Sequence, residues 1–581
     1  MNLVIVESPA KSKKIAGFLG AGWRVEACLG HVRDLPEAEL GVEVAADFRP
    51  TYEVLPGKGN VVKKLLKAIK EAEAVYVATD PDREGEAIAW HLLKLANIPK
   101  DKPVYRALFH AVTQDAVREA VAHPRALDIH LIEAQQARRI VDRLVGYLAS
   151  PLAAKALDGK FSAGRVQSVC LRLVVERERE IESFKPEIYW TLALQLAADG
   201  TPFTAKLHRV KDTDSTFKAR DPLDKLVTLM NGAQVWVGKA GRTVKARSPL
   251  PPFTTSSLQQ AASKGLGLSP EKTMALAQTL YEQGWITYMR TDGVSIAPEA
   301  QTAARNYIAR EHGADYIPPE PPTYIVKTAN AQEAHEAIRP TDVNRLPLDV
   351  DGDGAALYAL IWKRIIASQM SPALYTLTGA VIYTGKVQGQ PFPIEFRAQG
   401  RSLLFDGFLK VYEEPPDESE TEAEENGTLP PLKDNQLLKL VAPLVEEHQT
   451  HAPVRYTEAA LVQALEQHGI GRPSTYASMV KTIKDKSYVK VSQKRLVPTE
   501  NGIALRDFLM THFADVLAYD YTARLEDQLD QIASGQITRL EVLKAFWEAF
   551  NPQVVNAVEY ALAQAHSRRT SKPLTLRPAE D

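Results

Sequence analysis

Three carboxylates at alternate positions directly follow a predicted buried strand. Residues 74–78 are all apolar or small, which is typical of a strand covered on both faces of a sheet. Asp80, Asp82 and Glu84 come next, and the apolar spacing of 87–95 predicts a helix after them. Like charges this close repel unless a divalent cation lies between them, and Mg²⁺ takes oxygen ligands. The alternative is a solvated acidic turn, but the strand and the third acid favour a metal site.

A fourth carboxylate ends another short apolar run near the start of the chain. Glu7 follows residues 3–6, and two parallel strands that both end in acids would bring Glu7 beside the three carboxylates. Lys11 adds a cation that could neutralise a phosphate oxygen.

A tyrosine and an arginine two residues apart form a second chemical candidate, Tyr288 and Arg290. A phenol is a poor nucleophile near its ordinary pKa of about 10 and needs activation. The guanidinium of Arg290 could activate it while holding a phosphate. The spacing of the tyrosine and the arginine does not by itself establish a catalytic site.

A predicted helix within 131–186 carries a cationic and aromatic stripe, because Arg139, Arg143 and Tyr147 recur four residues apart. A solvated helix face is the default interpretation, but a tyrosine that can stack on a base favours single-strand binding. After it, the small residues and arginine of SAGRVQS at 162–168 begin a helix, which is a suitable phosphate site. His31 lies in a strand-end loop and by itself is typical of a surface histidine.

Composition excludes several classes of protein. The 581 residues suggest three to five domains, and a net charge of −2 excludes a generally basic coat, so DNA affinity would need local groups of Lys and Arg. The two cysteines are too few for a four-cysteine zinc site. The sequence also has no phosphate-loop motif of the kind that binds ATP. We therefore expect no zinc and no ATP. Without a signal peptide or a long apolar run, we expect a cytoplasmic protein with no membrane contact.

Six segments together resemble the type IA DNA topoisomerases. ESPAKSKKI at 7–15 and TDPDREGEAIAW at 79–90 resemble the family's Toprim domain, and YMRTD at 288–292 resembles its cleavage segment. AHEAIRP at 334–340 and GIGRPSTYA at 469–477 also match the family, as does SAGRVQS. The likeness covers about residues 1–560. One departure is Gly293, where the bacterial topoisomerase I pattern usually has serine.

The resemblance implies roles for individual residues. Tyr288 would be the nucleophile, with Lys11 and Arg290 stabilising charge and His335 bonding a phosphate. Glu7 would be the general acid for the leaving 3′-oxygen and would join Asp80, Asp82 and Glu84 around Mg²⁺. The candidate DNA contacts are His31, Arg138, Arg139, Asp142, Arg143, Tyr147, Lys155, Ser162, Ala163, Gly164, Arg165, Val166, Gln167, Arg290, Arg472, Thr475 and Lys486.

The implied activity is ATP-independent cleavage of one DNA strand through a 5′-phosphotyrosyl bond, then strand passage and religation. The expected partners are single-stranded and negatively supercoiled DNA, bound by a monomer associated with the nucleoid. A topoisomerase III-like decatenase is the nearest alternative. A Toprim nuclease or primase would share the acids without needing Tyr288, and a non-cleaving DNA-binding module would need neither.

The expected fold is multidomain α/β + α, arranged as the family's toroidal clamp. A Toprim parallel α/β domain is expected at 1–130, and a helical domain with the tyrosine at 248–372. A β-rich arch is expected at 187–247 and 373–432, with an acidic linker at 413–425, and a helical DNA-binding domain at 131–186 and 433–581. Residues 258–286 align with 461–489 at an offset of 203, which predicts winged-helix-like units in both helical regions.

Overall fold

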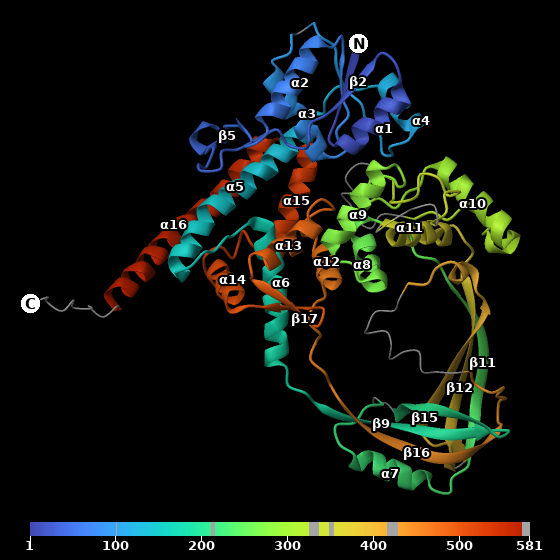
Figure 1. Ribbon diagram of the computed structural model, residues 1–581. Coiled ribbons are helices and arrows are strands. Elements are labelled where there is room, and N and C mark those ends of the chain that lie inside the picture. Colours follow the sequence, from blue (N-terminus) through green and yellow to red (C-terminus); the bar gives the residue numbers. More distant parts are fainter. Residues whose placement is uncertain are drawn as a thin grey trace, which may run out of the picture.

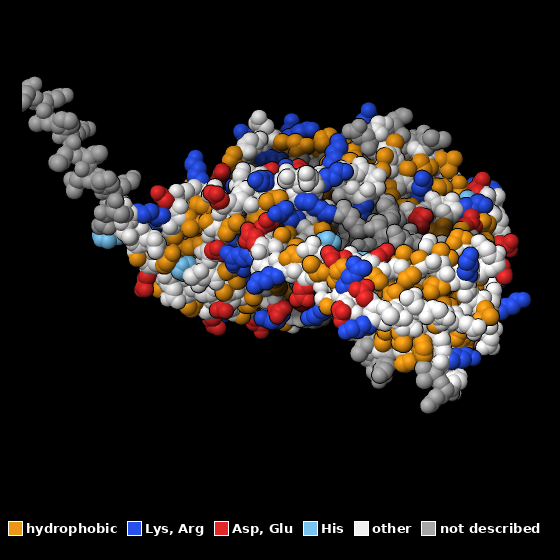
Figure 2. All heavy atoms as spheres, turned by 90° about the horizontal axis from the view of Figure 1, so that it is seen from below, with side chains coloured by type: hydrophobic (Ala, Val, Ile, Leu, Met, Phe, Trp, Pro, Cys, Tyr) orange, Lys and Arg blue, Asp and Glu red, His pale blue; other side chains and the backbone are white. Residues whose placement is uncertain are grey.

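The chain folds into several parts that are arranged as a clamp (Figure 1). The structure is a computed structural model that describes residues 1–99, 101–210, 215–324, 336–347, 352, 354–387, 389–414 and 428–571. An α/β domain lies at one end and a β-barrel at the opposite end, with helices between them. Basic and acidic side chains are intermixed on the face seen from the barrel end (Figure 2). Within these ranges, no helix is long and apolar enough to cross a membrane.

The α/β domain is built on a four-stranded parallel sheet in the order β2-β1-β7-β8. Alternate residues of the central strands β1 and β7 pack on opposite faces: Leu3 and Val75 belong to the core with α2 and α3, whereas Val4 packs toward α1 and α4. Cover on both faces explains the continuous apolar runs. The bounds are β1 (Asn2–Val6), α1 (Pro9–Leu19), β2 (Trp23–Ala27), β3 (Arg33–Asp34), β4 (Val42–Glu43), β5 (Arg49–Pro50), β6 (Glu53–Val54), α2 (Gly59–Glu71), β7 (Val75–Val77), α3 (Arg83–Ala96), β8 (Val104–Arg106) and α4 (Gln114–Ala122).

A second hydrophobic core joins helices from both ends of the chain. The long helices α5 and α16 lie side by side (Figure 1), and α12, α13 and the β17–β18 hairpin form a helix-turn-helix with a wing. The bounds are α5 (Ile129–Leu157), α6 (Arg165–Ser183), α12 (Glu458–Gln467), α13 (Tyr476–Asp485), β17 (Val489–Ser492), β18 (Arg495–Pro498), α14 (Glu500–His512), α15 (Tyr519–Ala533) and α16 (Arg539–Ser571).

The predicted internal repeat is visible in the packing of two helix pairs. Helix α8 (Thr255–Leu266) and helix α12 begin at positions 203 residues apart, and each is capped by a threonine, Thr254 or Thr457. Helix α8 packs on α12, and α9 packs on α13, so the two repeats contact each other. The bounds in the tyrosine-bearing part are α9 (Pro270–Glu282), α10 (Pro298–His312) and α11 (Gly354–Ser368).

The arch is a closed six-stranded barrel in the order β10-β15-β12-β11-β16-β9. Strand β16 (Leu437–Gln449) corrects the predicted boundary at 432, because it pairs with β9 from Lys439 to Gln449 and therefore belongs to the barrel rather than to the helical part. The predicted acidic linker lies mostly outside the described residues. The remaining bounds are β9 (Ile188–Ala198), β10 (Thr201–Val210), α7 (Asp221–Met230), β11 (Val235–Arg247), β12 (Ala373–Thr384), β13 (Lys386–Val387), β14 (Gln390–Pro391) and β15 (Ile394–Phe405).

One buried arginine fixes the end of β7, from which the acidic segment continues. Arg106, the last residue of β8, is fully buried and pairs with Glu86 at 2.8 Å. Its guanidinium also donates to the carbonyl oxygens of Val77 (3.0 Å), Thr79 (2.9 Å) and Asp80 (2.7 Å). A planar fork of donors is needed to hold so many acceptors at once. Arg106 is therefore a positioning residue for the acidic segment, which the sequence analysis did not identify.

We expect Arg106→Met to destabilise the α/β domain by about 3–5 kcal/mol, because buried Glu86 loses its nearest cation and keeps only the longer contact with Arg125 at 3.4 Å. The control Arg24→Met, in a partly exposed ion pair with Glu26, should cost less than about 1 kcal/mol. Amide hydrogen exchange of β7 and β8 in the full chain measures both. Equal protection in the two variants would contradict this role.

Candidate active site

The predicted acids meet at one edge of the parallel sheet. Strands β1 and β7 are neighbours in register, with Ile5 opposite Val77, so Glu7 and Asp80 follow adjacent strand ends. The backbone N–H of Asp80 donates to Glu7 Oε1 at 2.8 Å. Burial, together with the nearby charge of Asp80, raises the pKa of Glu7 to about 7.

A helix start and a glycine shape the rest of the acidic segment. Asp82 caps helix α3 by accepting the backbone N–H of Gly85 at 2.8 Å. A Cβ atom on Gly85 would lie 2.1 Å from the carbonyl oxygen of Asp80, so only glycine fits here. Glu84, the second residue of the helix, accepts from Gln135 Nε2 at 3.1 Å and lies 3.3 Å from His31 Nε2.

Each acid already has a positively charged or proton-donating neighbour. Lys11 is fully buried and forms an ion pair with Asp80, and its ammonium lies 4.8 Å from the ring centre of Tyr281. The guanidinium of Arg290 lies 3.4 Å from Asp82 Oδ2. Removing either charge of such a buried pair is strongly unfavourable. The two cations Lys11 and Arg290 therefore offset part of the charge of the acid cluster.

The donor chemistry suits Mg²⁺, but the acids do not form a preformed cage. The second oxygen of Asp80, Oδ2, is buried and has no hydrogen-bond partner within the described chain, so it can accept a cation. Among the described residues, no three Asp, Glu, His or Cys side chains converge into a metal site. Asp80, Asp82 and Glu84 could bind Mg²⁺ only alongside water or after their present contacts change, which suits an ion that keeps several waters.

The tyrosine reaches this cluster from another part of the chain. The phenol O–H of Tyr288 donates to Asp82 Oδ2 at 2.5 Å, and its backbone N–H donates to the carbonyl oxygen of His110 at 2.8 Å. The ring is only 1% exposed. Burial, followed by the charges of Asp82 and Asp80, raises the pKa of Tyr288 well above its ordinary value, while Arg290 opposes this shift. The phenol is therefore protonated in this closed arrangement, and its proton faces an acceptor.

The pKa of Asp82 is lowered, although burial acts in the opposite direction, because Arg290 and the Tyr288 hydrogen bond favour the carboxylate. Asp82 thus remains ionised between the tyrosine and the other acids. His335 lies outside the described residues. Its neighbour Glu336 forms an ion pair with Arg339 at 2.6 Å.

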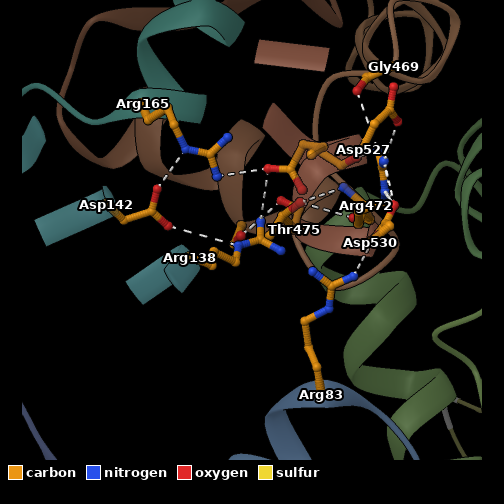
Figure 3. Close-up of polar contacts among 12 residues, drawn as sticks. Arg83, Arg138, Asp142, Arg165, Gly469, Arg472, Thr475, Asp527 and Asp530 are labelled. Atoms are coloured by element: carbon orange, nitrogen blue, oxygen red, sulfur yellow. Dashed lines mark hydrogen bonds and ion pairs between the residues drawn. The ribbon is translucent and has the colours of Figure 1, made fainter. Parts of the chain in front are cut away.

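Several predicted DNA contacts converge on a buried ion-pair cluster at the junction of the helices (Figure 3). Arg165 pairs with Asp142 at 2.9 Å and with Glu526 at 2.7 Å, and its side chain is 1% exposed. Arg138 lies within 3.9 Å of the same two acids. Buried acids therefore already neutralise Arg165 in this conformation, and its contact with a phosphate stays a prediction.

Helix α15 supplies the acids that the sequence analysis missed. Asp530 pairs with Arg472 at 2.7 Å and with Arg83 at 2.5 Å, and Asp527 adds a contact to Arg472 at 3.1 Å (Figure 3). Arg83 belongs to α3, so α15 links the acidic segment to the winged helix. The spacing of Glu526 and Asp530, four residues apart on a predicted helix, was the available signal.

The donors of the predicted stripe on α5 already have partners within the protein. Arg139 pairs with Asp34 at 2.8 Å, and Arg143 donates to the carbonyl oxygens of Leu35 and Glu39 at 3.2 Å. The hydroxyl of Tyr147 donates to the carbonyl oxygen of Ala38 at 3.1 Å. The Asp34 carboxylate and three backbone oxygens of segment 34–39 thus accept from the donors that were expected to face DNA.

The backbone amides before α6 are likewise engaged. The N–H groups of Ser162, Ala163 and Gly164 donate to hydroxyl groups of Tyr488 (2.7 Å), Ser150 (2.9 Å) and Ser168 (3.2 Å). The other candidates lie at helix ends or on exposed positions. Val166 and Gln167 are in the first turn of α6, Thr475 and Lys486 flank α13, and Lys155 is exposed near the end of α5.

The sequence of the chain matches models of known protein families. A DNA topoisomerase family model matches residues 126–544, and a Toprim domain model matches residues 2–112. The chain is 45% identical over 573 residues to "DNA topoisomerase 1" of Zymomonas mobilis, covering 96% of this chain and 46% of that protein. It is 43% identical over 578 residues to "DNA topoisomerase 1" of Rickettsia bellii, covering 95% of this chain and 71% of that protein.

A solved structure of a topoisomerase has a similar fold. Full-length topoisomerase I from Thermotoga maritima superposes with a TM-score of 0.82 at 38% identity, covering 95% of this chain and 90% of that one. The chain spans about half the length of the Zymomonas relative and most of the Rickettsia relative. By its sequence and its fold, the chain belongs to the type IA DNA topoisomerase family, in the group of bacterial topoisomerase I.

Proposed function

We propose that the protein is an ATP-independent type IA topoisomerase that relaxes negatively supercoiled DNA. The single observation that carries the proposal is the contact between Tyr288 and Asp82, because it unites a nucleophile with a Toprim acid 206 residues away. A nuclease or primase that used the acids alone would have no need for this phenol.

The proposed reaction exchanges one phosphodiester for another. The phenol oxygen of Tyr288 bonds to phosphorus, the bond from phosphorus to the 3′-oxygen breaks, and the 5′-phosphate stays on the tyrosine. The phenol proton has an acceptor in Asp82, and Glu7 supplies a proton to the leaving 3′-oxygen. Arg290 and Lys11 lie where they can stabilise the charge on phosphate. Attack by the 3′-hydroxyl after strand passage reverses each step.

Bound Mg²⁺ would supply positive charge for religation, held by Asp80, Asp82 and Glu84, with Glu7 beside them. The residue contacts support this assignment through the free oxygen of Asp80 and the raised pKa of Glu7. Mg²⁺ would also relieve the repulsion among the acids that Lys11 and Arg290 now offset.

The closed arrangement requires a movement before DNA can react, because Tyr288 is buried and its partner acids lie on a different domain. We propose that a single DNA strand enters when the tyrosine-bearing part separates from the α/β domain. The same separation provides the gap for another strand.

The arginines of the α5 stripe would contact DNA only after they leave segment 34–39. The arginines of the α15 cluster would do so only after they leave the acids of α15. We propose that the enzyme acts as a monomer in the cytoplasm, on the nucleoid.

We expect Tyr288→Phe to abolish the covalent adduct with DNA and to leave single-strand binding nearly unchanged, since only the attacking oxygen is lost. Tyr281→Phe is a matched control, because Tyr281 is equally buried and its ring centre lies 5.3 Å from that of Tyr288. Adducts trapped by denaturation and resolved on gels measure the difference. Any adduct formed by the Tyr288 variant would refute the assignment.

Replacing Asp80 and Asp82 together by asparagine should abolish relaxation and slow religation, because two charges that attract Mg²⁺ are removed. Cleavage itself needs no cation and should persist, but more slowly, because the variant loses Asp82 as the acceptor of the phenol proton. The control changes Asp101 and Asp115 to asparagine, which removes the same charge from exposed positions of the α/β domain. Plasmid relaxation over graded Mg²⁺ measures both variants, and an unaltered Mg²⁺ dependence in the first would argue against the site.

The raised pKa of Glu7 predicts a pH-dependent difference in stability without metal. Because the folded-state pKa is about 7 against a usual 4.5, the buried carboxylate costs stability progressively between these pH values and fully above them. Glu7→Gln should therefore match the wild type near pH 4 and exceed it by up to about 3 kcal/mol at pH 8. Denaturant unfolding at both pH values in a chelator tests this. A difference that shrinks as pH rises would show the sign to be wrong.

A further inference from the structure

On the outward face of β11, β12 and β15, exposed cations lie on either side of two glycines. Alternate residues of β12 and β15, including Ala380, Ile382, Phe396 and Ala398, are buried in the core of the barrel. Side chains on successive strand residues point to opposite faces, so the residues between these four face outward. β11, β12 and β15 lie next to one another in the barrel (Figure 1).

The register of these strands defines rows across the outward face, which we call the arch face. One row contains Lys239, Val381 and Arg397, and another contains Thr243, Leu377 and Arg401. Between them lies the row of Gly241, Gly379 and Gln399. The outermost row on one side contains Lys245, Tyr375 and Leu403. The outermost row on the other side contains Trp236, Tyr383 and Glu395. Rows two residues apart are separated by about 6.6 Å along a strand.

The glycine row makes the centre of the arch face flat and accessible. A Cβ atom on Gly241 would meet no atom within 4 Å, and one on Gly379 would meet only the Ala398 carbonyl oxygen at 3.9 Å. The side chains of Lys239, Arg397 and Arg401 are exposed on either side of this row. A polymer backbone can therefore approach the sheet closely between Lys239 and Arg397 on one side and Arg401 on the other.

Aromatic rings lie at both ends of the arch face and already contact cations. The guanidinium of Arg401 lies 3.5 Å from the ring centre of Tyr375, and the ammonium of Lys386 lies 5.0 Å from that of Trp236. The rings of Trp236 and Tyr383 are 5.3 Å apart. Exposed cations interleaved with aromatic faces are the combination that binds single-stranded nucleic acid, through phosphate contacts and base stacking.

The charge of the arch face is unbalanced, although the whole chain carries a net charge of −2. Its five rows contain four cations and one acid, Glu395. That acid is buried and already pairs with Arg397 at 2.7 Å and with Arg209 at 3.1 Å. The other cations of the arch face are exposed, and they can bind an anionic partner such as a phosphate backbone.

We propose that the arch face is a second contact surface for single-stranded DNA, separate from the site of Tyr288. The proposal deepens the proposed function and rests on it, since an enzyme that passes one strand through another must hold DNA in more than one place. Its occupant is the backbone of a strand laid across β11, β12 and β15, with bases stacked near Tyr375 or Trp236.

The test changes Lys239, Lys245 and Arg401 to glutamine in the full chain and leaves the Arg397–Glu395 pair intact. The control changes Lys63, Lys67 and Lys70 to glutamine, which removes equal charge from exposed positions of helix α2. Binding of a long labelled oligothymidylate is measured over a range of salt. Each phosphate contact contributes about 0.7 to the logarithmic salt slope on single strands, so the arch variant should lose about 2 from this slope. The control should retain the wild-type slope.

Adduct formation on an oligonucleotide just long enough for cleavage should be equal in the wild type and both variants, because this reaction needs one strand only. Equal salt slopes in the arch variant and the control would overturn the proposal and leave an acidic protein as the partner of this face. Absence of adduct in all three proteins would instead refute the proposed function, and the salt slopes would still decide the role of the arch face.

Discussion

Buried carboxylates that repel one another are the constraint on which the rest of the site depends. Glu7, Asp80 and Asp82 meet because two parallel strands end at the same edge of a sheet, and burial makes their charge costly. Lys11 and Arg290 neutralise part of this charge, and Arg106 holds the backbone that carries it. A metal ion or a phosphate can enter only by changing this balance.

The same principle organises the junction between the α/β domain and the winged helix. Glu526 is fully buried, and its pKa is kept low by surrounding arginines despite burial, which acts in the opposite direction. Asp530 is shared by Arg83, next to the capping residue of α3, and Arg472 of the winged helix. A phosphate that drew Arg472 away would also alter the surroundings of Arg83, so DNA binding and the acidic segment are physically connected.

Much of the chemistry could be predicted from sequence because its signals are local. An apolar strand followed by acids predicts where those acids lie, and the 203-residue offset predicts the paired helices α8 and α12. The partners of the arginines could not be predicted in this way. Arg165 meets Glu526, and Arg143 meets the carbonyl oxygens of Leu35 and Glu39, across more than 100 residues. Strand β16 was misplaced for a similar reason, since its partner β9 lies some 250 residues earlier.

The proposed reaction depends on one covalent bond, which mass spectrometry of the trapped adduct can locate. The wild-type chain is incubated with a single-stranded oligonucleotide, denatured and digested with protease and nuclease. We expect one modified peptide, with the 5′-phosphate of a nucleotide on the phenol oxygen of Tyr288. A nucleotide attached to any other residue, or joined to Tyr288 through its 3′ end, would contradict the proposed reaction.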